Sequence, residues 1–241
     1  HSVLLLEAGP DYPDFEHLPE EVKFGYATAT DIMTSDHNWQ FLGKASDTAP
    51  PMLVPRGRVT GGSSAINGQV FLRGVPEDYD SWAAMGNDEW AFPNLIQYFR
   101  KVEADPDFPD DDFHSSEGAI IVRRFKPDEM RPDQTAFYEA CREAGFADSP
   151  DHNAPDASGV GPVPLNNPNG IRFSTALGYL NPARHRLNLT IRPNCVTRKI
   201  IFEGKRAVGL EVESGGERFT VDAGEVILSS GAIGSPHIML L

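Results

Sequence analysis

The segment from Gly57 to Gly68 (GRVTGGSSAING) has the composition of a loop that binds an anionic ligand. Residues 61–68 include three glycines and two serines, and glycine lets the backbone adopt unusual conformations and approach a ligand closely. Free amides followed by the start of a helix would then hold a negatively charged group. A flexible Gly/Ser linker is the alternative, but the apolar Val59, Ala65 and Ile66 favour a packed segment.

Glu7 follows the apolar run Val3–Leu6, which predicts a strand buried on both faces of a parallel sheet. An acidic side chain at this point binds the ribose of a nucleotide in Rossmann-type folds, about 20 residues after a glycine-rich turn. The chain begins too close to Glu7 to include that turn. Many strands end in a carboxylate, so a purely structural role for Glu7 is an equally good interpretation.

A third segment, residues 225–236, combines an apolar run with small residues. Glu225–Leu228 predicts a second buried strand, and Ser229–Ala232 leads from it into a helix, with Pro236 near the first helical position. Free amides would again lie where a nucleotide could bind. A plain strand–turn–helix connection is the alternative.

The rest of the chain predicts helices mixed with strands. Apolar residues at helical spacing predict helices at residues 79–85, 93–102 and 133–144. Strands are expected at residues 120–122, 189–192 and 197–202, followed by a hairpin of residues 207–213 and 217–221. Residues 11–55 should be rich in loops, and residues 153–170 should be mostly irregular.

Two predicted buried strands, one near each end, bracket this mixed middle. The pattern is typical of an α/β fold (α+β overall) with a Rossmann-like core and a second domain inserted between its parts. We expect the core to comprise residues 1–75 and 190–241. Because the chain starts within a strand without Met and stops within a helical pattern, we expect a fragment that is incomplete at both ends.

Composition excludes several classes of function. The net charge of −14 disfavours nucleic-acid binding, and no apolar run is long enough to span a membrane. The acidic run Asp105–Asp112 predicts a solvated loop. Cys141 and Cys195 form neither a disulfide framework nor a metal-ligand spacing, so we expect no metal site and a cytoplasmic protein.

Together the three segments resemble the glucose–methanol–choline (GMC) oxidoreductases, in particular those of choline-dehydrogenase type. Residues 57–80 match the family's first signature, with paired glycines, paired small hydroxyls, Ile66-Asn67, then Phe71, Gly74 and Asp80. Thr60 departs from it, since an aliphatic residue usually stands there. Residues 231–241 resemble part of the second signature, and the opening LLLEAGP resembles the family's second strand.

The resemblance implies a protein that binds FAD. The positions that it assigns to cofactor binding are Glu7, Val59, Gly62, Ser63, Asn67, Gly68, Gln69, Val70, Val196, Ser230 and Gly231. Glu7 would bind the adenosine ribose, and the main chain at Val196 would contact adenine, with Ser230 and Gly231 at the same end of the cofactor. Some members carry a histidine bonded covalently to the flavin at the position of Ile66, so we expect non-covalent FAD here.

The other assigned positions lie nearer the flavin ring. Val59, Gly62 and Ser63 would line the pyrophosphate and flavin, and Asn67–Val70 would run beside the isoalloxazine. Residues 76–189 would then form a segment covering the flavin and part of a substrate domain.

The resemblance implies oxidation of a small-molecule alcohol by hydride transfer to the flavin, with oxygen or a quinone-type acceptor. The catalytic His and its Asn or His partner would lie beyond Leu241, and we expect each of the seven histidines present to be a surface or packing residue. A hydroxynitrile lyase of the same family and a catalytically inert fragment remain alternatives. A nicotinamide-dependent dehydrogenase is a poorer one, because it does not account for the first signature. The identity of the alcohol and the oligomeric state stay open.

Overall fold

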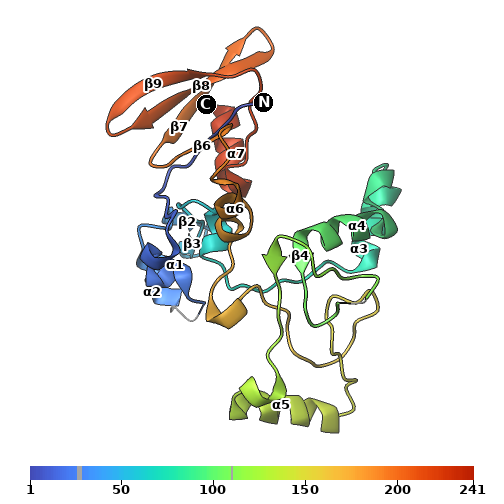
Figure 1. The fold of residues 1–241 in the computed structure, drawn as a ribbon. Helices are drawn as coiled ribbons and strands as arrows, with labels where there is room; N and C mark the ends of the chain where they lie inside the picture. Colours follow the sequence, from blue (N-terminus) through green and yellow to red (C-terminus); the bar gives the residue numbers. More distant parts are fainter. Residues whose placement is uncertain (26–28, 110) are drawn as a thin grey trace. The chain divides into compact units, whose positions relative to one another are not determined.

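The computed structural model describes residues 1–25, 29–109 and 111–241, and it combines helices with strands (Figure 1). This mixture agrees with the predicted fold class. The chain forms two compact units. Unit 1 contains residues 1–19, 28–66 and 181–241, and unit 2 contains residues 20–27 and 67–180. The assignment of a cofactor to one part of the chain and a substrate to the other stays a prediction.

A parallel strand pair holds the start of the chain in unit 1. Strand β1 (Val3–Leu6) pairs in register with β6 (Leu189–Arg192), so the expected strands at both places are confirmed. The burial predicted for β1 is wrong, because Val3 and Leu4 are 51% and 40% exposed. Among the described residues β1 pairs only with β6, and such a two-stranded ladder leaves its outer faces open.

An antiparallel sheet of three strands follows. It consists of β7 (Val196–Glu203), β8 (Arg206–Ser214) and β9 (Glu217–Asp222), with Ile200 and Val212 buried. The expected hairpin is confirmed, and its turn uses two glycines with positive φ, Gly215 and Gly216.

The end of the chain departs from two expectations. Residues 225–228 form no strand, and Ile227 is 82% exposed, because no described segment pairs with them and a strand needs such a partner. Helix α7 (Gly231–Leu240) confirms the predicted helix and lies against β7. Pro236 stands inside α7 rather than near its start, where its missing N–H removes one helical hydrogen bond.

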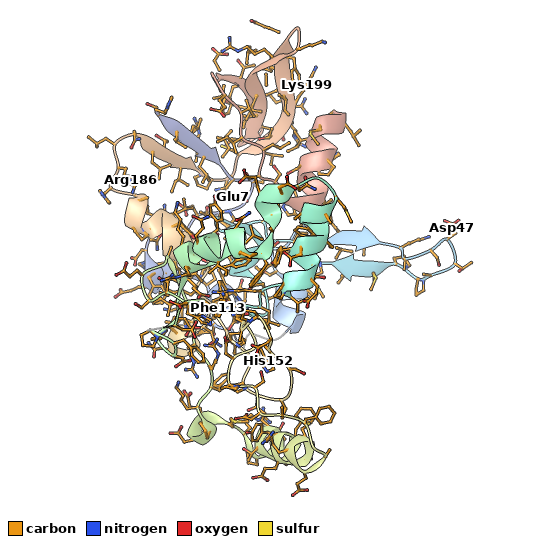
Figure 2. All side chains as sticks on the ribbon, turned by 90° about the vertical axis from the view of Figure 1, so that its right-hand side faces the viewer. Glu7, Asp47, Phe113, His152, Arg186 and Lys199 are labelled. Atoms are coloured by element: carbon orange, nitrogen blue, oxygen red, sulfur yellow. The ribbon has the colours of Figure 1, made fainter. Side chains whose placement is uncertain are left out.

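Short elements complete unit 1. They are η1 (Phe15–His17), α2 (Ala29–Thr34), β2 (Phe41–Gly43), β3 (Met52–Val54), η2 (Gly62–Ala65) and α6 (Asn181–Ala183). Strands β2 and β3 form an antiparallel hairpin, and Figure 2 shows Asp47 in the loop at its tip. The loop-rich character predicted for residues 11–55 is confirmed only in part, because short helices and the β2–β3 hairpin interrupt the loops among the described residues. Residues 26–28 lie outside the described residues.

Unit 2 combines helices with a very short pair of parallel strands. Its helices are α1 (Glu20–Lys23), α3 (Pro76–Ala84), η3 (Asp88–Trp90), α4 (Phe92–Val102), η4 (Pro127–Glu129), α5 (Pro132–Glu143), η5 (Pro168–Gly170) and the π-helix η6 (Ala176–Leu180). Strands β4 (Glu103–Ala104) and β5 (Ile120–Ile121) pair in parallel. The three predicted helices correspond to α3, α4 and α5, and α5 is followed by Gly145 with φ of 91°.

The acidic run was predicted wrongly at its first residue. Asp105 is fully buried and accepts a hydrogen bond from Arg124 Nη1 at 2.8 Å, because that cation replaces the water it gives up. Asp110, within the same run, lies outside the described residues.

No helix in the described ranges is long and apolar enough to cross a membrane.

Candidate functional site

The carboxylate of Glu7 lies where β1 ends and the chain turns. The Gly9 N–H donates to Glu7 Oε1 at 2.8 Å, so the side chain folds back over its own turn. The Glu7 main chain is held on both sides, since its N–H donates to Arg192 O and its carbonyl accepts from Cys195 N. Burial raises the pKa of Glu7, while the amides of Gly9 and Ala8 and the charge of Arg58 act in the opposite direction.

The segment after Gly57 packs directly against this turn. A Cβ at Gly9 would lie 1.8 Å from the carbonyl oxygen of Arg58, so only glycine permits the approach. The Thr60 N–H donates to the carbonyl of Pro10 at 3.0 Å. Val59 is 1% exposed, which confirms the packed segment over the flexible linker. The structure therefore brings Glu7 and Val59 into one locality.

Two glycines with positive φ form the next bend. Gly61 and Gly62 have φ values of 98° and 56°, and the Gly62 N–H donates to Val59 O at 2.8 Å. The Ser63 hydroxyl accepts from the Gly57 N–H, which ties the two ends of the bend together. A Cβ at Gly62 would meet no heavy atom within 4 Å, so a ligand could approach this backbone.

Residues 67–70 belong to unit 2. The Asn67 carbonyl accepts from Arg172 Nε at 2.9 Å, and the Asn67 side chain accepts from Gln69 N. Gln69 is buried and has a φ of 65°, a conformation that few side chains adopt. Gly68 and Val70 are exposed.

The remaining predicted positions are in unit 1. Val196 is the first residue of β7 and follows Cys195, whose N–H is bonded to Glu7 O, so Val196 lies near the Glu7 turn. Ser230 and Gly231 are exposed at the start of α7, where Gly231 has a φ of 78°. In the described part of the chain no hydrogen bond joins these two residues to the Glu7 turn.

Sequence reasoning missed two arginines. Arg58 contributes positive charge beside Glu7, and its guanidinium lies 5.3 Å from the centre of the Trp39 ring. Arg172 is 2% exposed and donates to the carbonyls of Asn67, Glu21 and Val22. A basic residue inside the glycine-rich segment was a usable signal for Arg58, whereas nothing local marks Arg172.

Unit 1 fits a ligand that has both a ribose and a phosphate. A carboxylate at the end of a parallel strand suits ribose hydroxyls, and the open glycine backbone beside it suits a pyrophosphate. One buried group also lacks a partner, because Thr60 Oγ1 has no hydrogen bond within the described ranges and Thr60 is only 4% exposed. These features fit the FAD that the sequence implies.

Comparisons with known proteins support the same conclusion. Residues 26–241 match the GMC oxidoreductase family. An oxygen-dependent choline dehydrogenase of Photobacterium profundum is 36% identical over 245 residues, which is 100% of this chain and 42% of the relative.

Two solved structures share the fold. The crystal structure of pyridoxine 4-oxidase from Mesorbium loti superposes with a TM-score of 0.90 and 29% identity, covering 99% of this chain and 46% of the other. An FAD-dependent oxidoreductase from Chaetomium thermophilum gives a TM-score of 0.85 and 26% identity, covering 99% of this chain and 42% of the other.

The chain thus spans under half the length of the relatives it matches. The matched region is the FAD-binding N-terminal domain of the family, which confirms FAD as the cofactor. From the match over residues 26–241, the chain belongs to the GMC oxidoreductase family.

Proposed function

We propose that the whole protein oxidises a small-molecule alcohol with FAD as the hydride acceptor. The observation that carries the proposal is the Glu7 turn packed against the glycine bend, in a chain of this family. When bound, FAD supplies a ring that accepts a hydride from the alcohol carbon.

The residues of this chain bind and orient that cofactor. Glu7 accepts hydrogen bonds from the ribose, and Arg58 favours the ionised carboxylate. The open backbone at Gly62 and Ser63 receives the pyrophosphate. Residues 67–70 flank the flavin, while Val196, Ser230 and Gly231 belong to the adenine end.

Two finer points belong to the same proposal. Ile66 is buried and has no nucleophilic atom, so FAD would be held without a covalent bond at this position. Acid precipitation of the protein should therefore release all the flavin into the supernatant. The free thiols Cys141 and Cys195 favour a cytoplasmic location, which cell fractionation would test.

The substrate and the electron acceptor are suggested by the names of relatives. One is called an oxygen-dependent choline dehydrogenase and another a pyridoxine 4-oxidase, so choline, pyridoxine and oxygen are the first compounds to try. Quinone-type acceptors would be compared with oxygen in the same assay.

The test begins with the affinity for FAD. Glu7→Gln should raise the dissociation constant about 10- to 100-fold, since a hydrogen bond to a charged group contributes about 1.5–3 kcal/mol. The matched control is Glu203→Gln, an exposed carboxylate at the end of β7, which should leave the affinity unchanged. Equal affinities of the two variants would refute the role of Glu7.

The second step tests the reaction itself. Anaerobic addition of an alcohol should bleach the visible absorbance of the oxidised flavin, because the flavin accepts the hydride. A protein that binds FAD but is bleached by no alcohol would refute alcohol oxidation. Cyanide release from a cyanohydrin by that protein would instead favour the lyase of the same family.

A further inference from the structure

His114 is buried in unit 2 between two carboxylates. Its Nδ1 lies 2.8 Å from Glu103 Oε1 and its Nε2 lies 2.9 Å from Asp151 Oδ2. The side chain is 1% exposed, and the Phe108 ring stacks on it with 5.1 Å between ring centres. Both ring nitrogens are therefore shielded from water.

The partners of these carboxylates determine the protonation of His114. Arg73 Nη2 donates to Glu103 Oε1, and Arg124 Nη2 donates to Asp151 Oδ1 at 2.6 Å. Guanidinium nitrogens are donors only, so the oxygen of Glu103 or Asp151 that faces each guanidinium acts as an acceptor. A neutral imidazole has one N–H and would point a lone pair at one of the two carboxylates. An imidazolium donates from both nitrogens and satisfies both contacts at once, so it is the form that this geometry favours.

The charges around this imidazolium balance. The cluster contains as many cations as carboxylates. The cations are Arg73, His114 and Arg124, and the carboxylates are Glu103, Asp105 and Asp151. Asp105 Oδ2 lies 3.4 Å from His114 Nδ1. At its edge Asp107 pairs with Lys126 and lies 3.6 Å from Arg124. Burial by itself lowers the pKa of His114, but the hydrogen bonds to Asp151 and Glu103 outweigh it and raise the pKa to about 9.

Hydrogen bonds connect both carboxylates, Glu103 directly and Asp151 through Asn153, to the same stretch of chain, Phe71–Arg73. Through Glu103, His114 holds the Arg73 side chain. Through Asp151, it holds Asn153, whose N–H donates to Asp151 Oδ1. The Asn153 carboxamide then accepts from the Arg73 N–H at 2.9 Å and donates to Phe71 O at 3.0 Å.

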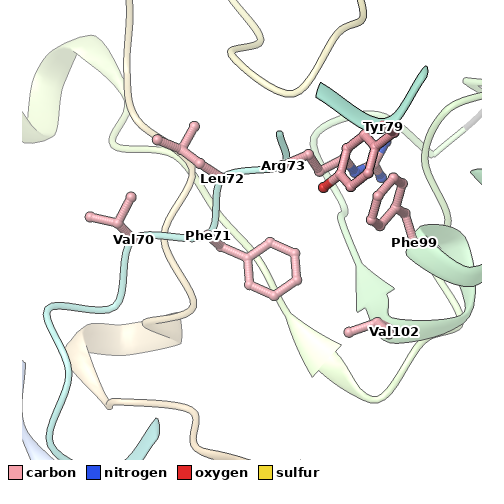
Figure 3. A pocket seen from close by; sticks show the side chains of 7 residues that line it. All are labelled: Val70, Phe71, Leu72, Arg73, Tyr79, Phe99 and Val102. Carbon is pink, nitrogen blue, oxygen red and sulfur yellow. The ribbon is translucent and has the colours of Figure 1, made fainter. Parts of the chain in front are cut away.

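Phe71–Arg73 thus has its backbone and one side chain fixed by groups that meet at His114. The guanidinium of Arg73 also lies 5.1 Å from the centre of the Phe99 ring. Figure 3 shows Phe71, Leu72 and Arg73 in succession along one side of a pocket of about 200 Å³, with Tyr79 and Phe99 beside Arg73.

We propose that His114, as an imidazolium bound to Glu103 and Asp151, is a positioning residue for the segment that flanks the flavin. Phe71–Arg73 directly follows residues 67–70, so the hydrogen bonds that fix Phe71–Arg73 also limit the movement of residues 67–70. The inference rests on the proposed function for the role of residues 67–70. The fixing of Phe71–Arg73 is a property of unit 2 alone.

The test compares two histidine variants of the flavin-loaded protein. His114→Gln removes the charge and one of the two opposed donors. His152→Gln is the matched control, because His152 follows Asp151 in sequence but donates to the Gly161 carbonyl rather than to a carboxylate. Hydrogen exchange is read by mass spectrometry on overlapping peptides across residues 67–75, and the difference in uptake between peptides that begin on either side of Arg73 isolates its amide.

A reference in unit 1 separates local from global effects. The rate for Arg73 is divided by the rate for Val221, an amide in the β8–β9 pair, which cancels the common dependence on hydroxide. In His114→Gln this ratio should rise at least about 10-fold at pH 7, the effect of losing about 1.4 kcal/mol of local protection. The same variant should bind FAD more weakly, and His152→Gln should match the wild type in both measurements.

An unchanged ratio in a folded His114→Gln protein would overturn the proposal. Should the variant fail to fold, the wild type decides, because its ratio should rise as the pH passes about 9 and a flat profile from pH 7 to 10.5 would overturn the inference. A raised ratio with unaltered FAD affinity would overturn the link to the flavin. A wild type that binds no FAD would refute the proposed function, while the exchange ratio would still decide the role of His114 in fixing Phe71–Arg73.

Discussion

Raising the pH should destabilise unit 2 because the buried His114 loses its proton. His114 has a pKa raised from 6.5 to about 9 by its carboxylate partners. Below pH 6.5 the imidazole is protonated in both the folded and the unfolded chain, so the stabilising contribution is fully present. As the pH rises through 9 the folded protein gives up the same proton, and the contribution disappears.

The size of this effect follows from the shift. The rise of the pKa from 6.5 to about 9 corresponds to about 3 kcal/mol, at about 1.36 kcal/mol for each pKa unit. Unfolding free energies of single domains are about 5–15 kcal/mol, so the loss would be a large part of the total. It should be spread between pH 6.5 and 9 and be complete above that range.

Tryptophan fluorescence can follow unit 2 separately. Trp82 and Trp90 lie in unit 2, and Trp39, the third tryptophan, lies in unit 1. In a Trp39→Phe background the remaining signal reports unit 2, so urea unfolding measured from pH 6 to 10 gives its stability. The His152→Gln control keeps His114 and its ion pairs. Its unfolding free energy should therefore fall by about 3 kcal/mol over this pH range, as in the wild type.

His114→Gln should remove the pH dependence of the unfolding free energy, because glutamine does not titrate. At pH 7 the variant should be less stable by about 3–5 kcal/mol, because two buried carboxylates lose a cation. Between pH 6.5 and 10 its stability should change by less than about 1 kcal/mol from this source. Wild type and variant that lose stability in parallel over this range would refute the reasoning.

The acid side gives an independent check on the same ion pair. Burial raises the pKa of Asp151, but His114, the Asn153 amide and Arg124 outweigh it and lower the pKa to about 2. The stabilisation from this carboxylate is therefore present above pH 3.8 and is lost as the pH falls through 2. It amounts to about 2 kcal/mol and cannot be added to the value for His114, since the two groups share one interaction.

Three further substitutions test other contacts by urea unfolding. Gly9→Ala should cost about 3 kcal/mol or more, because its Cβ would lie 1.8 Å from the Arg58 carbonyl oxygen and the backbone must shift. Thr60→Val should stabilise the FAD-free protein by about 1–2 kcal/mol, since it replaces a buried hydroxyl that has no partner among the described residues. Arg172→Met should cost about 3 kcal/mol or more, because it leaves the Asn67, Glu21 and Val22 carbonyls unpaired.

Each of these substitutions has a control of the same chemical type. Gly224→Ala adds a Cβ that meets nothing within 4 Å. Thr190→Val changes an exposed residue of β6, and Arg100→Met changes an exposed arginine of α4. Effects that do not differ from those of the controls would mean that the contacts around Gly9, Thr60 and Arg172 are unimportant for stability.

Elements whose signals are local were predicted well from the sequence. The hairpin of β8 and β9 needs only alternating strands and a turn, and Gly215-Gly216 supplies the positive φ values that the turn requires. The strand predicted at residues 225–228 is wrong, because an apolar run indicates that a segment can be buried but does not indicate which strand pairs with it. The exposure of Val3 and Leu4 has the same origin.

The residues proposed to bind the cofactor could be selected from the sequence because they lie in recognisable segments. Gly61 and Gly62 have the positive φ values that their residue type allows, and Glu7 follows its strand as expected. The cluster around His114 was not accessible. Glu103 and Asp151 are separated from His114 by 11 and 37 residues, and no periodic pattern connects them. Asp105 was assigned to solvent because it begins an acidic run, and only the fold reveals Arg124 beside it.

The cluster around His114 is better explained by positioning than by stability. Buried ion pairs often contribute little net free energy, and apolar residues of equal volume can replace them without loss. An apolar replacement here would leave the Asn153 amide without its acceptor, and Asn153 is the residue that binds the Arg73 N–H and the Phe71 carbonyl. A core without charges could match the stability of unit 2 but could not fix those two backbone groups. The cluster therefore specifies where Phe71–Arg73 lies, which is the property that the proposed role of this segment beside the flavin requires.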